Sequence, residues 1–315
     1  MAMKFNFVRG HMGGNLIVLL RGDQMPAGHE LETAVRLLAP THLHGHEAGI
    51  LYSTGTAGQI EAKIAEPSLP CFISACGGFT QVLGAALIET DFGELFGVNQ
   101  DASKVEAKLL TDGGPTNLSI DTYAGKSLRI RTNMDSFVKE CYDRGIGTSI
   151  HKGLEVMQAG KFLVVNAEKF KAAYPQIDLD KWDSATRRIL SDIQHEFQDK
   201  TGEIEPNVVV YDWQPQHGGH VRVVFPHYVD NDFFEPSCGT GSVALGIAML
   251  SWRELENLIT DRQGRLTLNL ESGGGRELGG PEVTTLEMDI VDGVVKATSF
   301  SHSLVEITST GEARL

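Results

Sequence analysis

Residues 236–242 read PSCGTGS and lead directly into an apolar segment, Val243 to Leu250. Glycines allow a sharp turn and a close approach of the backbone, and the run that follows is typical of a helix. The unpaired amides of a helix start can bind an anion, and its positive end is expected to lower the pKa of a nearby cysteine. The stretch therefore predicts a reactive thiol, Cys238, beside a cradle for a carboxylate.

A second copy of this pattern lies in the first half of the chain. Residues 74–80 read SACGGFT and follow an apolar segment, 69–73. They lead into residues 81–88, QVLGAALI, whose apolar positions keep helical spacing. Cys76 and Cys238 are about half the chain length apart. Two halves, each with a strand, a Cys-Gly turn and a buried helix, indicate a duplicated unit with a site between the copies.

Length and charge limit the classes of function. At 315 residues the chain exceeds the usual size of a single core, so two domains are expected. The net charge of −14 argues against a nucleic-acid partner or an anionic membrane surface. No apolar run reaches the roughly 18 residues that span a bilayer, and residues 1–9 lack a secretory apolar region. A cytoplasmic location is therefore expected.

The four cysteines are too sparse for a disulfide framework and lack the paired spacing of a structural zinc site. Cys71 and Cys141 are expected to be small buried residues, whereas the matched contexts of Cys76 and Cys238 favour chemistry. Residues 42–46, HLHGH, invite a metal interpretation, but Gly45 and the preceding Pro40-Thr41 indicate a loop. Glu47 is the only carboxylate nearby, so no metal site is predicted.

Hydrophobic patterns predict a mostly β chain with a helical middle. Period-two and apolar runs predict strands at 4–8, 16–20, 47–54, 59–65, 104–111, 118–122, 128–132, 208–213, 220–225, 266–270, 284–290, 293–298 and 303–307. Helical spacing predicts helices at 80–89, 134–143, 154–159 and 167–173, and an amphipathic helix from Trp182 that ends at residues 200–202, KTG. Asn15 follows the Gly13-Gly14 loop, where it is either a turn residue or an amide ligand.

Together these features resemble the diaminopimelate epimerase family of cofactor-independent amino-acid racemases and epimerases. Residues 4–5 and 13–15, KF and GGN, are similar to the family's glycine–asparagine entry motif. Residues 76–78, CGG, are similar to its first catalytic-cysteine motif, usually Cys-Gly-Asn-Gly. Residues 238–241, CGTG, match the second cysteine motif in full.

Two further segments extend the resemblance to nearly the whole chain. Residues 206–208, PNV, are similar to an Asn-Val segment whose asparagine helps to hold the substrate, and residues 291–307 are similar to the last strands. The family's Glu-Arg pair before the second cysteine has no counterpart, because residues 228–235 read YVDNDFFE. An arginine that grips a carboxylate is not replaced by other residues. A smaller or differently charged amino acid is therefore expected, rather than diaminopimelate.

The resemblance implies an α+β fold of two similar domains, each a β-sheet wrapped around a central helix, with the active site in the cleft between them. The expected domains are residues 1–125, joined by the C-terminal strands at about 285–315, and residues 126–284. It also implies a small-molecule substrate, a possible homodimer, and no pyridoxal, metal or other cofactor. The expected acid/base pair is Cys76 and Cys238, and the expected substrate ligands are Asn15, Gly77, Gly78, Asn207, Gly239, Thr240 and Gly241.

Three functions remain open at this point. The first is a racemase or epimerase that inverts the α-carbon of an amino acid with two cysteines. The second is an isomerase that shifts a proton in a carboxylic acid, as in the methylaconitate isomerase and phenazine-biosynthesis relatives of the same fold. The third is a non-catalytic protein, either a redox sensor whose two thiols form a disulfide or a binding module. The presence of both cysteines favours the first, because the isomerase relatives often replace one or both.

Overall fold

A buried helix stands at the centre of each half of the chain. Helix α2 (Gly77–Glu89) lies in the first half, and all of its residues up to Ile88 are buried. Helix α7 (Gly239–Ser251) lies in the second, with most of its residues buried. A helix that is apolar on all sides is typical of a buried position, and in each unit strands surround this helix.

The computed structural model describes residues 3–176, 184–203, 206–226, 235, 237–255, 264–272 and 282–315. The chain divides into two units, Met1–Ser136 with Phe300–Leu315, and Phe137–Ser299. In the described residues, no helix is long and apolar enough to cross a membrane.

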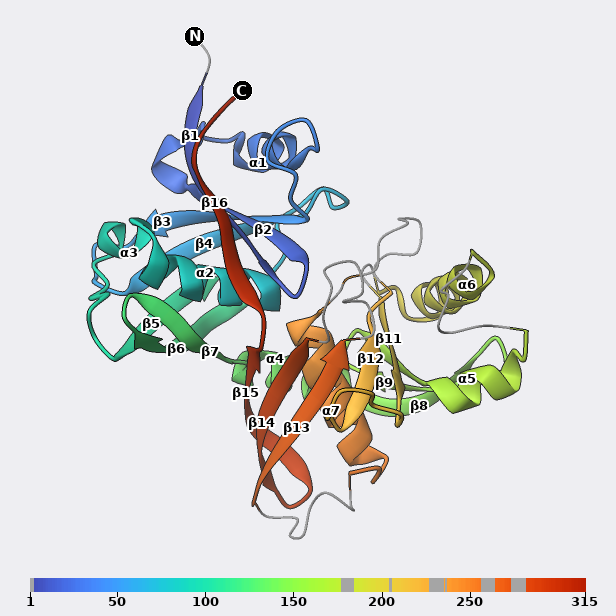
Figure 1. Ribbon diagram of the computed structural model, residues 1–315. Helices are drawn as coiled ribbons and strands as arrows, with labels where there is room; N and C mark the ends of the chain where they lie inside the picture. Colours follow the sequence, from blue (N-terminus) through green and yellow to red (C-terminus); the bar gives the residue numbers. More distant parts are fainter. Residues whose placement is uncertain are drawn as a thin grey trace. The chain divides into compact units, whose positions relative to one another are not determined.

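In unit 1, one sheet has the strand order β16-β1-β2-β3-β4-β5-β6-β7. Helix α2 packs against β16 and β1 at one end of this order and against β7 at the other, so the sheet curls around it (Figure 1). Helix α1 covers a second apolar cluster, formed with residues of β2 and β3. The strands are β1 (Lys4–Met12), β2 (Asn15–Arg21), β3 (Glu47–Ser53), β4 (Gln59–Ala65), β5 (Lys104–Thr111), β6 (Gly114–Tyr123), β7 (Lys126–Asn133) and β16 (Val305–Arg314), and the helices are η1 (Gly22–Gln24), α1 (Glu30–Leu38), α2 and α3 (Phe92–Leu95).

In unit 2, the strand order is β15-β14-β13-β12-β11-β10-β9-β8. Helix α7 packs against β9, β10, β11 and β14 (Figure 1). Helices α5 and α6 cover another cluster, formed with β9, β10 and β11. The strands are β8 (Ile146–His151), β9 (Leu154–Ala159), β10 (Phe162–Asn166), β11 (Asn207–Asp212), β12 (Val221–Val224), β13 (Gly264–Ser272), β14 (Val283–Val291) and β15 (Val294–His302), and the helices are α4 (Asp135–Arg144), α5 (Ala167–Ala173), α6 (Ser184–Thr201) and α7.

The two units repeat one sheet pattern. Starting from β16 in unit 1, successive strand pairs up to β6 are antiparallel, antiparallel, parallel, antiparallel, parallel and antiparallel. Starting from β8 in unit 2, the pairs up to β14 follow the same sequence. In both units the central helix connects the two strands of the second parallel pair. The α+β fold predicted from sequence, with two similar domains around central helices, is therefore confirmed.

The expected helix at 154–159 is wrong, because this segment forms strand β9. Lys152 and Gly153 both have positive φ, 50° and 82°, as in the two-residue turns that join antiparallel strands. This turn allows β9 to pair with β8, and the other edge of β9 pairs with β10. An isolated helix of six residues is unstable, whereas the strand is stabilised by hydrogen bonds to both of its neighbours. Helix α1 and strands β8 and β10 were not predicted, and the predicted helix residue Trp182 lies outside the described residues.

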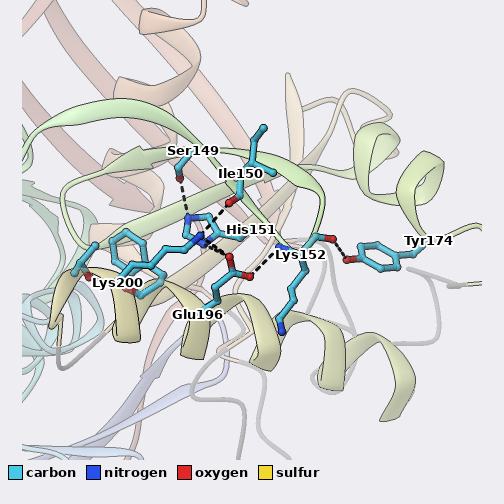
Figure 2. Close-up of polar contacts among 9 residues, drawn as sticks. Ser149, Ile150, His151, Lys152, Tyr174, Glu196 and Lys200 are labelled. Carbon is cyan, nitrogen blue, oxygen red and sulfur yellow. Dashed lines mark hydrogen bonds and ion pairs between the residues drawn. The ribbon is translucent and has the colours of Figure 1, made fainter.

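Polar contacts join helix α6 to the β8–β9 turn (Figure 2). The Glu196 carboxylate accepts a hydrogen bond from the Lys152 backbone amide at 2.9 Å and pairs with Lys200 Nζ at 2.5 Å. His151 is buried beneath them, with Nε2 2.8 Å from Ser149 Oγ. Burial and the Lys200 charge lower the pKa of His151, so this imidazole is neutral near pH 7 and the cluster holds the turn on the helix.

A matched pair of glycines tests how tightly each central helix is packed. A Cβ at Gly84 in α2 would lie 2.6 Å from Ile130 Cγ2, whereas a Cβ at Gly246 in α7 would lie 3.0 Å from the flexible Met288 Sδ. We expect Gly84→Ala to lower the free energy of unfolding by about 1–2 kcal/mol, since overpacking outweighs the gain in helix propensity. Gly246→Ala should cost less. Urea unfolding of both variants, and of Gly84→Ala in an Ile130→Ala background where the penalty should shrink, provides the measurement. Equal stabilities for the wild-type protein and Gly84→Ala would contradict this view of the core.

Candidate active site

Cys76 and Cys238 occupy the same position relative to the two central helices. Cys76 is the residue before α2, in extended conformation, and its Sγ accepts the Phe79 amide hydrogen at 3.2 Å. Cys238 is the residue before α7, also extended, and its Sγ accepts the Gly241 amide hydrogen at 3.4 Å. A side chain at this position satisfies one of the amides that a helix start leaves unpaired. Each thiol is therefore held by the first turn of a buried helix.

The glycines next to Cys76 allow other elements to approach the start of α2. A Cβ at Gly78 would lie 3.0 Å from Asn15 Nδ2 and 3.4 Å from Ile17 Cδ1. Asn15, the first residue of β2, is buried, and its Oδ1 lies 3.2 Å from His46 Nδ1. The predicted residues Asn15, Gly77 and Gly78 are thus brought together with Cys76 in unit 1.

The corresponding residues of unit 2 gather at the start of α7. Gly239, Thr240 and Gly241 form its first turn, and Thr240 Oγ1 lies 3.4 Å from Cys238 Sγ. Asn207 begins β11 and pairs in register with Phe162, whose ring would lie 3.2 Å from a Cβ at Gly241. The register therefore puts the Asn207 strand end beside the helix that carries Cys238.

A buried carboxyl group contacts the first thiol. Cys76 Sγ donates a hydrogen bond to Glu47 Oε2, from the first residue of β3. Burial raises the pKa of Glu47 to about 7, the hydrogen bond with Cys76 opposes this shift, and the charge of Glu66 adds to it. The pair thus titrates near neutral pH rather than in the usual range of a carboxylic acid.

The second thiol contradicts an expectation from sequence. Burial raises the pKa of Cys238 well above its ordinary value, and the charge of Glu235 raises it further. The hydrogen bonds from Thr240 and Gly241 lower this pKa, but by less. The positive end of the helix was expected to make Cys238 acidic; desolvation and a neighbouring carboxylate outweigh it.

The remaining cysteines and histidines have other environments. Cys141 is buried, as predicted, and burial raises its pKa to about 12, whereas Cys71 is exposed rather than buried. His46 accepts the Leu16 amide hydrogen at Nδ1 (3.1 Å). Among the described residues, no three histidine, cysteine or carboxylate side chains form a possible metal cluster.

Sequence reasoning missed the acidic neighbours of the thiols. In the sequence, Glu47 stands next to the histidine run at 42–46, and Glu66 belongs to no motif. Their proximity depends on strand register, which no local pattern encodes. Glu235 had a signal, because it lies three residues before Cys238. The segment 228–234, where the arginine of the resembled family is missing, lies outside the described residues.

No protein-family model matches the chain, and no curated protein matches its sequence. Solved structures do share its fold. A hydroxyproline epimerase from Agrobacterium vitis with bound trans-4-hydroxy-L-proline has a TM-score of 0.66 at 12% identity, over 99% of this chain and 93% of that one. A PhzF-family phenazine biosynthesis protein from Bacillus anthracis has a TM-score of 0.61 at 12% identity, over 98% of both chains. A methylitaconate delta-isomerase has a TM-score of 0.61 at 12% identity, over 100% of this chain and 96% of that one.

The chain has the fold that these three proteins share. The sequence resemblance to diaminopimelate epimerases was therefore too narrow. The structural likeness includes the hydroxyproline epimerase, the PhzF-family protein and the methylitaconate delta-isomerase. At this level of identity the likeness concerns the fold and leaves the reaction to be argued from the site.

We expect Glu235→Gln to lower the pKa of Cys238, because the substitution removes a negative charge that opposes thiolate formation. The chain has four cysteines, so protein labelled with ¹³C at cysteine Cβ allows each thiol to be titrated by NMR once its signal is assigned with Cys→Ser variants. Glu155→Gln, at an exposed ion pair with Lys169 in the same unit, is the matched control and should leave the Cys238 titration in place. An unchanged Cys238 titration in Glu235→Gln would refute the assigned cause.

Proposed function

We propose that this chain is a cofactor-independent racemase or epimerase that inverts the α-carbon of an amino acid, with Cys76 and Cys238 as its acid/base pair. One observation carries the proposal: each copy of the duplicated unit holds a thiol at the residue before its buried central helix. Cys141 lies outside this pattern, because it is on helix α4 and its Sγ contacts the Ala159 carbonyl oxygen. A thiol retained at both equivalent positions suits a reaction that needs one proton-transfer group for each face of a carbon.

The residues at the two helix starts suit this chemistry. An α-proton is far less acidic than a thiol, so the carbanion formed by its removal requires stabilisation. The first-turn amides at Gly77-Gly78 and at Gly239-Thr240 can bind the α-carboxylate and the charge that develops on it, while the Gly241 amide holds Cys238 Sγ. One thiolate removes the proton, which leaves its electron pair on carbon, and the other thiol donates a proton to the opposite face. The two groups exchange roles in the reverse direction.

A small amino acid is the favoured substrate class. The hydroxyproline epimerase with the same fold binds trans-4-hydroxy-L-proline, and residues 228–235 of this chain contain no arginine for a second carboxylate. Proline-like and small neutral amino acids are therefore the first compounds to test, with Asn15 and Asn207 proposed as substrate ligands.

A proton-shifting isomerase of a carboxylic acid is the second candidate. The methylitaconate delta-isomerase has the same fold over the whole chain. Its reaction class shares the removal of a proton next to an electron-withdrawing group but returns the proton to a different carbon. The two candidates differ in product, so an assay that observes both the substrate α-proton and new vinyl signals separates them.

Incubation of the reduced protein with single L-amino acids in heavy water should replace the α-proton by deuterium and form the D-enantiomer. Cys76→Ser and Cys238→Ser should each reduce the exchange by at least about 10²-fold, because general acid–base groups contribute about 10²–10⁴-fold. Serine also caps helices well, so the fold should persist. Loss of the α-proton NMR signal and chiral chromatography are the measurements.

Cys71→Ser and Cys141→Ala are the matched controls and should retain exchange. If Cys141→Ala were as inactive as Cys238→Ser while still folded, the site assignment would be wrong. Shifted double bonds in an unsaturated acid, without exchange of any amino acid, would select the isomerase instead.

A further inference from the structure

The duplicated sheets allow residues of the two units to be equated one by one. Glu47 and Asn207 are each the first residue to pair across the first parallel strand pair of their unit, with Ile17 and Phe162 as their partners. An isolated bridge joins Ile64 to Ile73 in unit 1, and another joins Phe225 to Glu235 in unit 2. Each bridge ends three residues before a cysteine. Glu47 is therefore the counterpart of Asn207, and Ile73 is the counterpart of Glu235.

Each thiol thus has an acidic neighbour, but from a different position of the repeat. In unit 1 the carboxyl comes from the start of β3, and the position before the helix holds Ile73. In unit 2 the carboxyl comes from the position before the helix, Glu235, and the strand start holds Asn207. Carboxyl groups are rarely buried without a compensating partner. A buried carboxyl near each of the two equivalent thiols, supplied from two different positions, indicates that both thiols need an acidic neighbour.

We infer that Glu47 is the positioning residue of Cys76, taking and returning the thiol proton inside a buried pair. The inference deepens the proposed racemase reaction and rests on it for its catalytic meaning. The transfer balances within the pair: the Sγ–H bond breaks, a carboxylate oxygen of Glu47 gains the proton, and the negative charge moves from oxygen to sulfur.

Such a transfer explains how a buried thiol can become a base. Ionising an isolated buried thiol would create a new charge in a medium that solvates it poorly. When the proton moves to Glu47, the pair carries one negative charge before and after, so no additional charge is buried. The Phe79 amide, which already donates to Cys76 Sγ at 3.2 Å, stabilises the charge when it lies on sulfur.

The charges around Glu47 set the pH at which this pair operates. Cys76 faces it from the residue before α2, and Glu66 acts on it from the end of β4. Burial and Glu66 raise the pKa of Glu47 to about 7. Below this pH the pair holds two protons and no charge; above it the pair holds one proton and can supply a thiolate. Activity that needs this thiolate should therefore rise as the pH increases through about 7.

The test follows the ¹³Cβ signal of Cys76 through a pH titration, which requires no substrate. The wild-type protein should show a step near pH 7, where the pair acquires its single charge. In Glu47→Gln this step should vanish and Cys76 should titrate at higher pH, since the amide cannot take the proton. Glu235→Gln, the matched variant of unit 2, should leave the Cys76 step in place, and Glu47→Asp should restore it in part.

The same variants are then assayed for exchange of the substrate α-proton. Glu47→Gln should lower the exchange rate by about 10²-fold at pH 7 and move its rising limb to alkaline pH, whereas a merely structural residue would leave the limb in place. The inference fails if Cys76 shows no step near pH 7, or the same step in the wild-type protein and Glu47→Gln. If the steps behave as expected but no amino acid exchanges, the proposed function fails and the buried pair stands.

Discussion

The site depends on two opposing effects at the start of a buried helix. The unpaired amides of the first turn favour a thiolate, and each cysteine accepts one of them, from Phe79 or Gly241. Burial of the same sulfur opposes ionisation, and at Cys238 it prevails, because its pKa lies well above the ordinary value. A thiol placed in this way is well oriented but poorly ionised. The carboxyl neighbour of Cys76 acquires its importance from this conflict, since a proton exchanged with Glu47 changes the charge on sulfur without changing the charge of the pair.

The parts of the fold that follow local rules could be predicted from sequence. Helix α2 and helix α7 each begin with a Cys-Gly turn and continue as an apolar run, so their position and burial were evident. The strand at 154–159 was mistaken for a helix because its conformation depends on pairing with β8 and β10, and the Lys152-Gly153 turn that sets this pairing was not recognised. Pairing is a property of two segments, and hydrophobic spacing within one of them does not report it.

The same distinction separates the predicted from the unpredicted site residues. Cys76, Gly77 and Gly78 are neighbours in sequence, and the turn they form carries its own signal. Glu47 lies in another strand and reaches Cys76 only because β3 begins where it does against β2. Duplication would have suggested a search for an acidic residue at the counterpart position, but that residue is Asn207. The carboxyl of unit 2 instead comes from Glu235. The two acidic residues therefore stand at non-equivalent positions of the repeat, and aligning the two halves by sequence does not pair them.

This exchange of positions has a consequence for the proposed reaction. A two-thiol racemase has two protonation forms, one with the thiolate at Cys76 and one with it at Cys238, and each form accepts one enantiomer. Cys76 is paired with a carboxyl whose pKa is about 7, whereas Cys238 is pushed toward the thiol by burial and by Glu235. The two thiolates therefore have different surroundings, so the two forms differ in free energy. The solution equilibrium between enantiomers fixes only the ratio of their kcat/KM values. The asymmetry must then appear in kcat and in KM separately, because the two enantiomers bind forms of the enzyme that differ in population.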